Sequence, residues 1–123
     1  MKIIVKFQYS VIVEYFLFAA CRHSYCKSVS EEINDLKAKG MVDTTQVENQ
    51  WQRYVEWGFK DNLGISENGL LIRRHNDAHI AQLMELWWKE YQNGCLRDQV
   101  SLMPCIYRTG FMPYFQFIEE KIR

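Results

Sequence analysis

The 123 residues make one ordinary domain, long enough to bury a core without disulfides or structural metals. Hydrophobic residues are 48% and charged residues 24% of the chain, which excludes intrinsic disorder. Fifteen Lys and Arg balance fifteen Asp and Glu, so no net positive charge attracts nucleic acid or anionic lipid. We therefore expect one domain, residues 1–123, with no nucleic-acid partner.

The N-terminal stretch has some features of a secretory signal, because Lys2 and Lys6 precede apolar residues that end at Cys21. Glu14 interrupts that stretch, and the uncharged run Phe7–Val13 is too short to span a bilayer. We predict a mature strand or helix here and no transmembrane segment. The four cysteines are then expected to be reduced thiols. The protein itself is expected in the cytoplasm, with attachment to the inner face of the membrane as the alternative.

The first half of the chain predicts strands followed by two helices. Residues 3–5 and 16–21 have the composition of strands, and residues 8–15 between them fit a short helix or a continuing strand. Ser28 and Glu31 form a capping-box pair that predicts a helix over residues 29–39, ended by Gly40. Asp43 caps a second predicted helix, whose apolar residues repeat at helical spacing up to Gly58.

The second half predicts a strand and further helices. Residues 61–68 have loop composition, and residues 69–73 predict a short buried strand. Asn76 is the expected cap of the strongest helix, which ends at Asn93 and Gly94 and carries an apolar stripe of Ile80, Leu83, Met84, Trp87, Trp88 and Tyr91. Pro104 is expected to open or kink a short helix through Arg108, and residues 111–122 fit a last amphipathic helix. Three or more helices with two or three short strands predict an α/β or α+β fold.

Two groups of residues could carry metal or nucleophile chemistry. Cys21, His23 and Cys26 offer soft zinc ligands, but structural zinc sites need a second pair, which does not follow. We therefore favour core cysteines over zinc, and over an activated Cys–His nucleophile. His75 and His79 are spaced by four residues, and we expect His79 at the surface.

The aromatic residues make up 15% of the chain and could serve as sugar-stacking platforms. The helical spacing of Trp51, Trp87 and Trp88 instead predicts that they belong to the core. Trp57, beside Gly58, is the tryptophan we expect to be partly exposed.

Polar residues beside rigid elements are the best remaining candidates for a site. Glu67 and Asn68 precede the predicted strand, and Arg97, Asp98 and Gln99 follow the long helix. Their structural alternatives are helix capping by Asp98 and turn formation by Asn68.

At these same positions the sequence resembles a known family. It is similar to the C-terminal part of the glycosyltransferase-like domain of bacterial polysaccharide-locus proteins and plant mucilage-related glycosyltransferases, over about residues 16–107. One plant member is described as an alkaline ceramidase. The resemblance rests on segments that occur in order: Ser30–Glu32, Tyr54–Phe59, Gly64–Arg73, His75–Asp77, Met84–Trp88 and Arg97–Leu102.

The resemblance implies a glycosyltransferase A-type fold, of which this chain supplies the later half. The donor-binding half with its acidic metal motif has no counterpart here, and Ser24 and Cys26 stand where the family has Pro and Arg. The chain is therefore expected to be a truncated or divergent member. A homo-oligomer and a missing N-terminal half are the two alternatives for its protein partner.

The implied activity is sugar transfer from a nucleotide-sugar donor to a glycan acceptor in polysaccharide synthesis, with manganese or magnesium as the family's cation. No residue of this chain is assigned as a metal ligand. The alternative is a non-catalytic remnant or interaction module of the same fold. The family implies catalytic roles for Asp98, Gln99 and Glu67, and substrate-binding roles for Arg97, Asn68, His23, Arg73 and His75.

Overall fold

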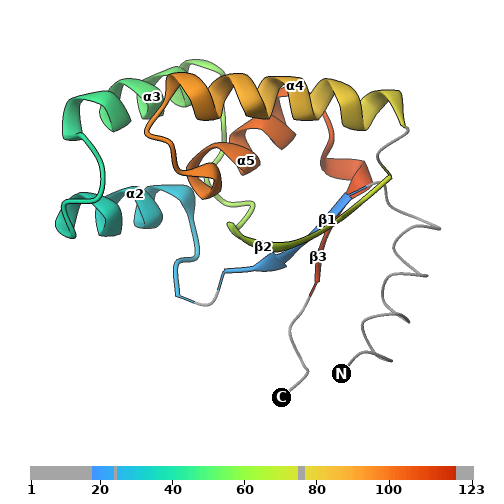
Figure 1. Cartoon of the computed structure of the whole chain (residues 1–123), viewed down its shortest axis with the longest axis horizontal. Helices are drawn as coiled ribbons and strands as arrows, with labels where there is room; N and C mark the ends of the chain where they lie inside the picture. Colours follow the sequence, from blue (N-terminus) through green and yellow to red (C-terminus); the bar gives the residue numbers. More distant parts are fainter. Residues whose placement is uncertain (1–17, 24, 75–76, 119–123) are drawn as a thin grey trace.

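The computed structural model describes residues 18–23, 25–74 and 77–118. Within these residues, four α-helices cover one face of a three-stranded mixed sheet (Figure 1). The predicted α/β class is confirmed. Within the described ranges, none of the helices combines the length and the apolar content that crossing a bilayer requires.

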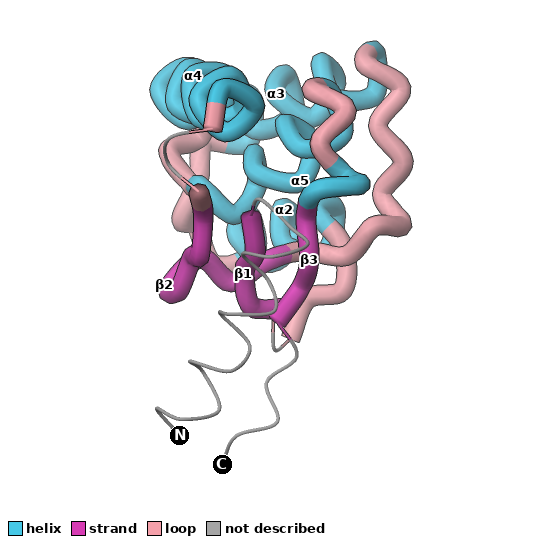
Figure 2. The backbone as a smooth tube through the Cα atoms, turned by 90° about the vertical axis from the view of Figure 1, so that its right-hand side faces the viewer, coloured by secondary structure: helices cyan, strands magenta, loops and turns pink. Residues whose placement is uncertain are grey.

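The sheet is built around strand β1 (Phe18–Arg22), which confirms the strand predicted over residues 16–21 where that range is described. β1 pairs antiparallel with β2 (Ser66–Arg73) and parallel with β3 (Phe115–Ile118), giving the order β2-β1-β3 seen in Figure 2. Ala19 and Ala20 are fully buried in β1. The elements predicted for residues 3–5 and 8–15 lie outside the described residues.

Helices α2 (Val29–Ala38) and α3 (Thr44–Glu56) begin where their capping residues predict. Ser28 Oγ accepts the Glu31 N–H at 3.2 Å, and Asp43 Oδ1 accepts the Gln46 N–H at 2.8 Å. These bonds satisfy N–H groups that have no partner inside the first turn of a helix.

Helix α4 (Ala78–Asn93) is the longest helix of the described chain. Its cap is Asp77, whose Oδ1 accepts the His79 N–H at 2.8 Å, so the prediction of Asn76 as the cap is wrong by one residue. Asn76 itself lies outside the described residues. Ile80 and Leu83 are buried beneath the helix, as the apolar stripe predicts.

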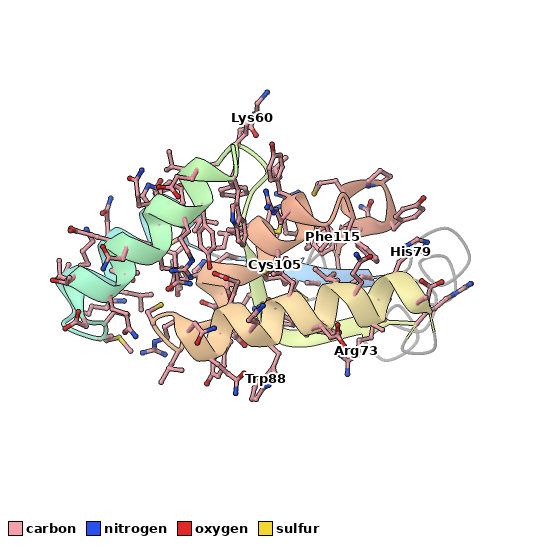
Figure 3. All side chains as sticks on the ribbon, turned by 90° about the horizontal axis from the view of Figure 1, so that it is seen from above. Lys60, Arg73, His79, Trp88, Cys105 and Phe115 are labelled. Atoms are coloured by element: carbon pink, nitrogen blue, oxygen red, sulfur yellow. The ribbon has the colours of Figure 1, made fainter. Side chains whose placement is uncertain are left out.

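Helix α5 (Asp98–Arg108) contains Pro104 in its interior, so this helix is longer than the short one expected around the proline. A proline inside a helix removes one backbone donor. Every residue from Val100 to Ile106 is nevertheless buried, because α5 lies between the sheet and the other helices (Figure 2). Figure 3 shows Cys105 of this helix in the middle of the molecule.

The helix predicted over residues 111–122 is wrong within the described part of that range. A 3₁₀ turn, η1 (Met112–Tyr114), leads instead into β3. Phe115 and Phe117 are buried while Gln116 is exposed, which is the period of two that a strand requires. Pairing with β1 gives this segment its structure.

Candidate functional site

A cleft with a volume of about 430 Å³ lies between the end of β2, one side of α4 and the start of α5. We call it the Trp88 cleft; it is lined by Arg73, Met84, Trp87, Trp88, Tyr91 and Asp98. Its volume is in the range of small-molecule sites in proteins. Figure 3 shows Trp88 and Arg73 along the same long side of the molecule, both projecting outward.

The aromatic wall of the cleft is formed by Trp88 and Tyr91. Trp88 is 61% exposed, and its ring stacks on Tyr91 with centroids 5.8 Å apart and planes 15° from parallel. The prediction that Trp88 belongs to the core is therefore wrong. Trp88 lies at the margin of a wide apolar stripe, and this margin forms the wall of the cleft instead of packing under another element.

The neighbouring Trp87 takes the inner position that the stripe predicts. Its Nε1–H donates to the backbone carbonyl of Asp98 at 3.2 Å, and its ring lies 6.5 Å from that of Phe18 in the core. This contact joins α4 to the first residue of α5 and so positions Asp98 at the cleft.

The polar side of the cleft is formed by Arg73 and Asp98, both exposed. Arg73 lies at the end of β2 and its Nη1–H donates to Met84 Sδ at 3.0 Å. Asp98 is the first residue of α5, whose cap is Arg97, so the alternative that Asp98 is the helix cap is wrong. A carboxylate in the first turn is still favoured by the helix dipole.

Glu67 and Asn68 lie in strand β2 rather than in the predicted loop. Cys21 pairs with Glu67 while the preceding Ala20 pairs with Leu71, so residues 68–70 form a bulge opposite β1. Bulges redirect side chains and are frequent beside active sites. Asn68 Oδ1 accepts a hydrogen bond from Ser66 Oγ at 2.6 Å, whereas its buried Nδ2 has no partner within the described residues.

A second cavity, of about 550 Å³, lies along α2 from Glu32 to its C-terminal end, and we call it the His23 cavity. It is lined by His23, Tyr25, Cys26, Glu32, Asp35, Leu36, Lys39, Met41 and Arg97. Two residues that the sequence grouped with the sugar site, His23 and Arg97, therefore belong to a different cavity from Arg73 and Asp98. Arg97 and Asp98 are adjacent at the start of α5, yet Arg97 lines the His23 cavity and Asp98 lines the Trp88 cleft.

His23, Cys26 and Glu32 meet in the His23 cavity, with one potential ligand atom from each within 4.8 Å of the others. The zinc alternative considered from the sequence consists of Cys21, His23 and Cys26. In the structure, the third potential ligand beside His23 and Cys26 is Glu32, not Cys21. Nothing in the spacing of the sequence indicates Glu32, which the first turns of α2 bring to the end of β1.

The surroundings of Cys26 and His23 argue against an activated Cys–His pair. His23 Nε2 lies 3.3 Å from Glu32 Oε2, so the imidazole faces the carboxylate. Burial, and then a hydrogen bond to Glu32, raises the pKa of Cys26 to about 11. The thiol therefore keeps its proton at neutral pH and is a poor nucleophile.

The remaining candidate residues have separate positions. Gln99 is half-buried in the first turn of α5, and His75 lies outside the described residues. His79 is exposed, as expected, and stacks on Tyr114 with centroids 5.9 Å apart.

Comparison with protein-family models gives a match over most of the chain. A family described as "TOD1/MUCI70, glycosyltransferase-like domain" matches residues 2–117, a wider range than the sequence motifs cover. No curated protein and no solved structure matches the chain. The α/β architecture is therefore observed, and the glycosyltransferase A-type assignment stays a prediction.

Proposed function

Because the chain belongs to the TOD1/MUCI70 glycosyltransferase-like domain family, we propose that its Trp88 cleft binds a sugar ring of a glycan acceptor during sugar transfer. The observation that carries the proposal is the stacked, exposed pair of Trp88 and Tyr91 beside the polar side chains of Arg73 and Asp98. A large aromatic ring that remains exposed next to a polar wall calls for an explanation other than packing.

The chemistry of the cleft suits a carbohydrate. The face of an indole ring attracts the C–H face of a sugar, since that face is apolar and carries a slight positive charge. The carboxylate of Asp98 can accept hydrogen bonds from sugar hydroxyls, and the guanidinium of Arg73 can donate to them. Charged hydrogen bonds of this kind fix the orientation of a ligand.

In the proposed reaction, Asp98 orients the acceptor hydroxyl or removes its proton, and alignment with the donor lowers the barrier. Gln99 lies next to it in the first turn of α5 as a second hydrogen-bonding group. Glu67 and Asn68, at the bulge of β2, are proposed to contact the acceptor, and the unpartnered Nδ2 of Asn68 supports this role. Arg97 faces the other cavity, and we propose that it contacts the phosphates of a donor.

The divalent cation that the family implies does not fit the potential ligands that the described residues bring together. The group of three consists of an imidazole, a thiol and a carboxylate, whereas magnesium and manganese favour oxygen ligands. No step of the proposal depends on a metal.

The binding step is tested by saturation-transfer NMR with the whole chain and a panel of monosaccharides and oligosaccharides. We expect saturation transfer to at least one sugar, and loss of at least about 90% of that signal in Trp88→Ala. Stacking of a ligand ring on an aromatic side chain contributes on the order of 1–3 kcal/mol where it has been measured for nucleobases, and we expect a comparable effect for a sugar. Tyr114→Ala removes another exposed aromatic ring, away from the cleft, and should leave the signal unchanged. Sugar binding that survives Trp88→Ala would contradict the proposal.

The catalytic step is tested by Asp98→Asn in a transfer assay with nucleotide-sugar donors. We expect turnover to fall on the order of 100-fold or more, because a general base contributes that much, while the far-UV circular dichroism is retained. Glu85→Gln, an exposed carboxylate on α4, is the matched control. Sugar binding without any transfer would favour the alternative of a non-catalytic module.

A further inference from the structure

Glu32 is a buried carboxylate with an imidazole and a thiol beside it. Only 6% of the residue is exposed. Its carboxylate faces His23 Nε2 at 3.3 Å, and the thiol of Cys26 belongs to the same group, whose potential ligand atoms all lie within 4.8 Å of one another. Buried carboxylates are usually paired with a cation or coordinate a metal.

Backbone hydrogen bonds determine which ring nitrogen of His23 carries the proton. His23 Nδ1 accepts the N–H of Tyr25 at 3.1 Å and the N–H of Cys26 at 3.0 Å, so this nitrogen must present a lone pair. The imidazole is then neutral, with its proton on Nε2 and directed at Glu32. The carboxylate of Glu32 therefore faces an imidazole N–H, with the thiol of Cys26 beside it.

The three side chains are spaced like the ligands of one metal ion. Two ligand atoms about 2.0 Å from a tetrahedral zinc ion are separated by about 3.3 Å, and a thiolate lies slightly farther away. The distance between His23 Nε2 and Glu32 Oε2 is 3.3 Å, and all three potential ligand atoms lie within 4.8 Å of one another.

We propose that His23, Cys26 and Glu32 form a zinc site that ties the end of β1 to α2. Imidazole and thiolate select zinc over magnesium or calcium, and thiolate and carboxylate together balance its two positive charges. Three protein ligands leave a fourth position for water or for Asp35. Asp35 lies one turn after Glu32, lines the same cavity and is paired with Lys39 at 2.9 Å.

The ion has two routes to the site. His23 and Cys26 line the His23 cavity and also a separate cavity of about 360 Å³ bordered by Arg22 and residues 62–65. His23 and Cys26 therefore border both cavities, whereas Glu32 lines the His23 cavity and not the other.

Binding requires a defined rearrangement of protons. Zinc displaces the thiol proton of Cys26 into solvent, and the imidazole proton moves from Nε2 to Nδ1 as Nε2 takes the metal. The N–H groups of Tyr25 and Cys26 can no longer donate to Nδ1, so the turn after β1 must re-form its hydrogen bonds. Proton release and a local change at this turn accompany binding.

The test uses the whole chain, reduced and freed of metal, titrated with cobalt and then with zinc. Cobalt is a spectroscopic substitute for zinc and gives a near-ultraviolet charge-transfer band when a thiolate binds it. We expect this band at one cobalt per chain, its loss on addition of zinc, and its absence in Cys26→Ser. Cys21→Ser changes a neighbouring half-buried cysteine outside the ligand group and should keep the band.

A second variant covers the case in which Cys26→Ser fails to fold, which circular dichroism would reveal. Glu32→Gln keeps the thiol and removes one ligand charge, and we expect it to weaken cobalt binding by at least about tenfold. No thiolate band in the unmodified chain, a band that persists in Cys26→Ser, or equal affinity in Glu32→Gln each overturns the proposal.

Discussion

Trp87 and Trp88 show how two adjacent, identical residues take different roles on one helix. Trp87 packs against the core and donates a hydrogen bond to α5, whereas Trp88 is exposed in the cleft. An apolar stripe at helical spacing includes both, because it defines a face without showing where the covering elements end. The exposure of Trp88 could not have been predicted without knowing that nothing described packs over that margin of α4.

The two tryptophans should differ in their contribution to stability. Trp87→Ala is expected to lower the free energy of unfolding by about 3 kcal/mol, because it removes a packed ring from between Phe18 and α5. Trp88→Ala should change it by less than about 0.5 kcal/mol. Urea unfolding followed by circular dichroism measures both, and equal losses would contradict the structural difference between the two positions.

An ion pair that the sequence does not indicate joins helices α3 and α4. Arg53 Nη2 lies 2.7 Å from Glu90 Oε1, and the Glu90 side chain is only 8% exposed. The two residues are far apart in the sequence, and Glu90 lies on a helix whose polar residues are otherwise expected at the surface. Tertiary packing of the two helices buries it.

Removing the positive charge of Arg53 should lower the free energy of unfolding. Arg53→Met leaves the Glu90 carboxylate buried without its partner, and we expect a loss of about 2 kcal/mol, reduced from the usual value because Arg53 is partly exposed. Glu90→Gln retains a hydrogen bond and should lose less. Lys39→Met breaks the exposed Lys39–Asp35 pair and should give no resolvable change in the same chemical unfolding assay.

The helices show best how much of the fold is predictable. The beginnings of α2 and α3 were predicted from local chemistry, since Ser28 and Asp43 cap the N–H groups next to them. The last segment has the amphipathic pattern of a helix, but it forms a strand because it pairs with distant β1. The bulge that places Glu67 and Asn68 in β2 likewise depends on strand register, which one sequence does not reveal.

For the whole molecule, buried proton donors predict loss of stability in alkali. Burial raises the pKa of Cys105 and of Tyr54, so both keep their protons in the folded chain. In the unfolded chain they lose them near their ordinary pKa values of 9.0 and 10.0. Their contribution to stability is therefore complete below about pH 9 and decreases as the pH rises further.

We expect the free energy of unfolding to fall as the pH rises above about 9, as measured by urea unfolding at a series of pH values. Cys105→Ala should give a shallower decline, because one of the titrating groups is gone. Val100→Ala, also buried in α5, should lower stability at every pH without changing the slope. If stability declines with the same slope in Cys105→Ala, the Cys105 thiol does not contribute to the loss of stability in alkali.

The parallel pairing of β1 with β3 also bears on the synthesis of the protein. Phe18 lies beside Phe115, so the central strand receives one of its neighbours only after the ribosome has made nearly all the described residues. Until then, one edge of β1 offers unpaired backbone groups to any other strand. The growing chain is therefore exposed to wrong pairing until late in translation, and removal of β3 should give an aggregating product rather than a smaller soluble domain.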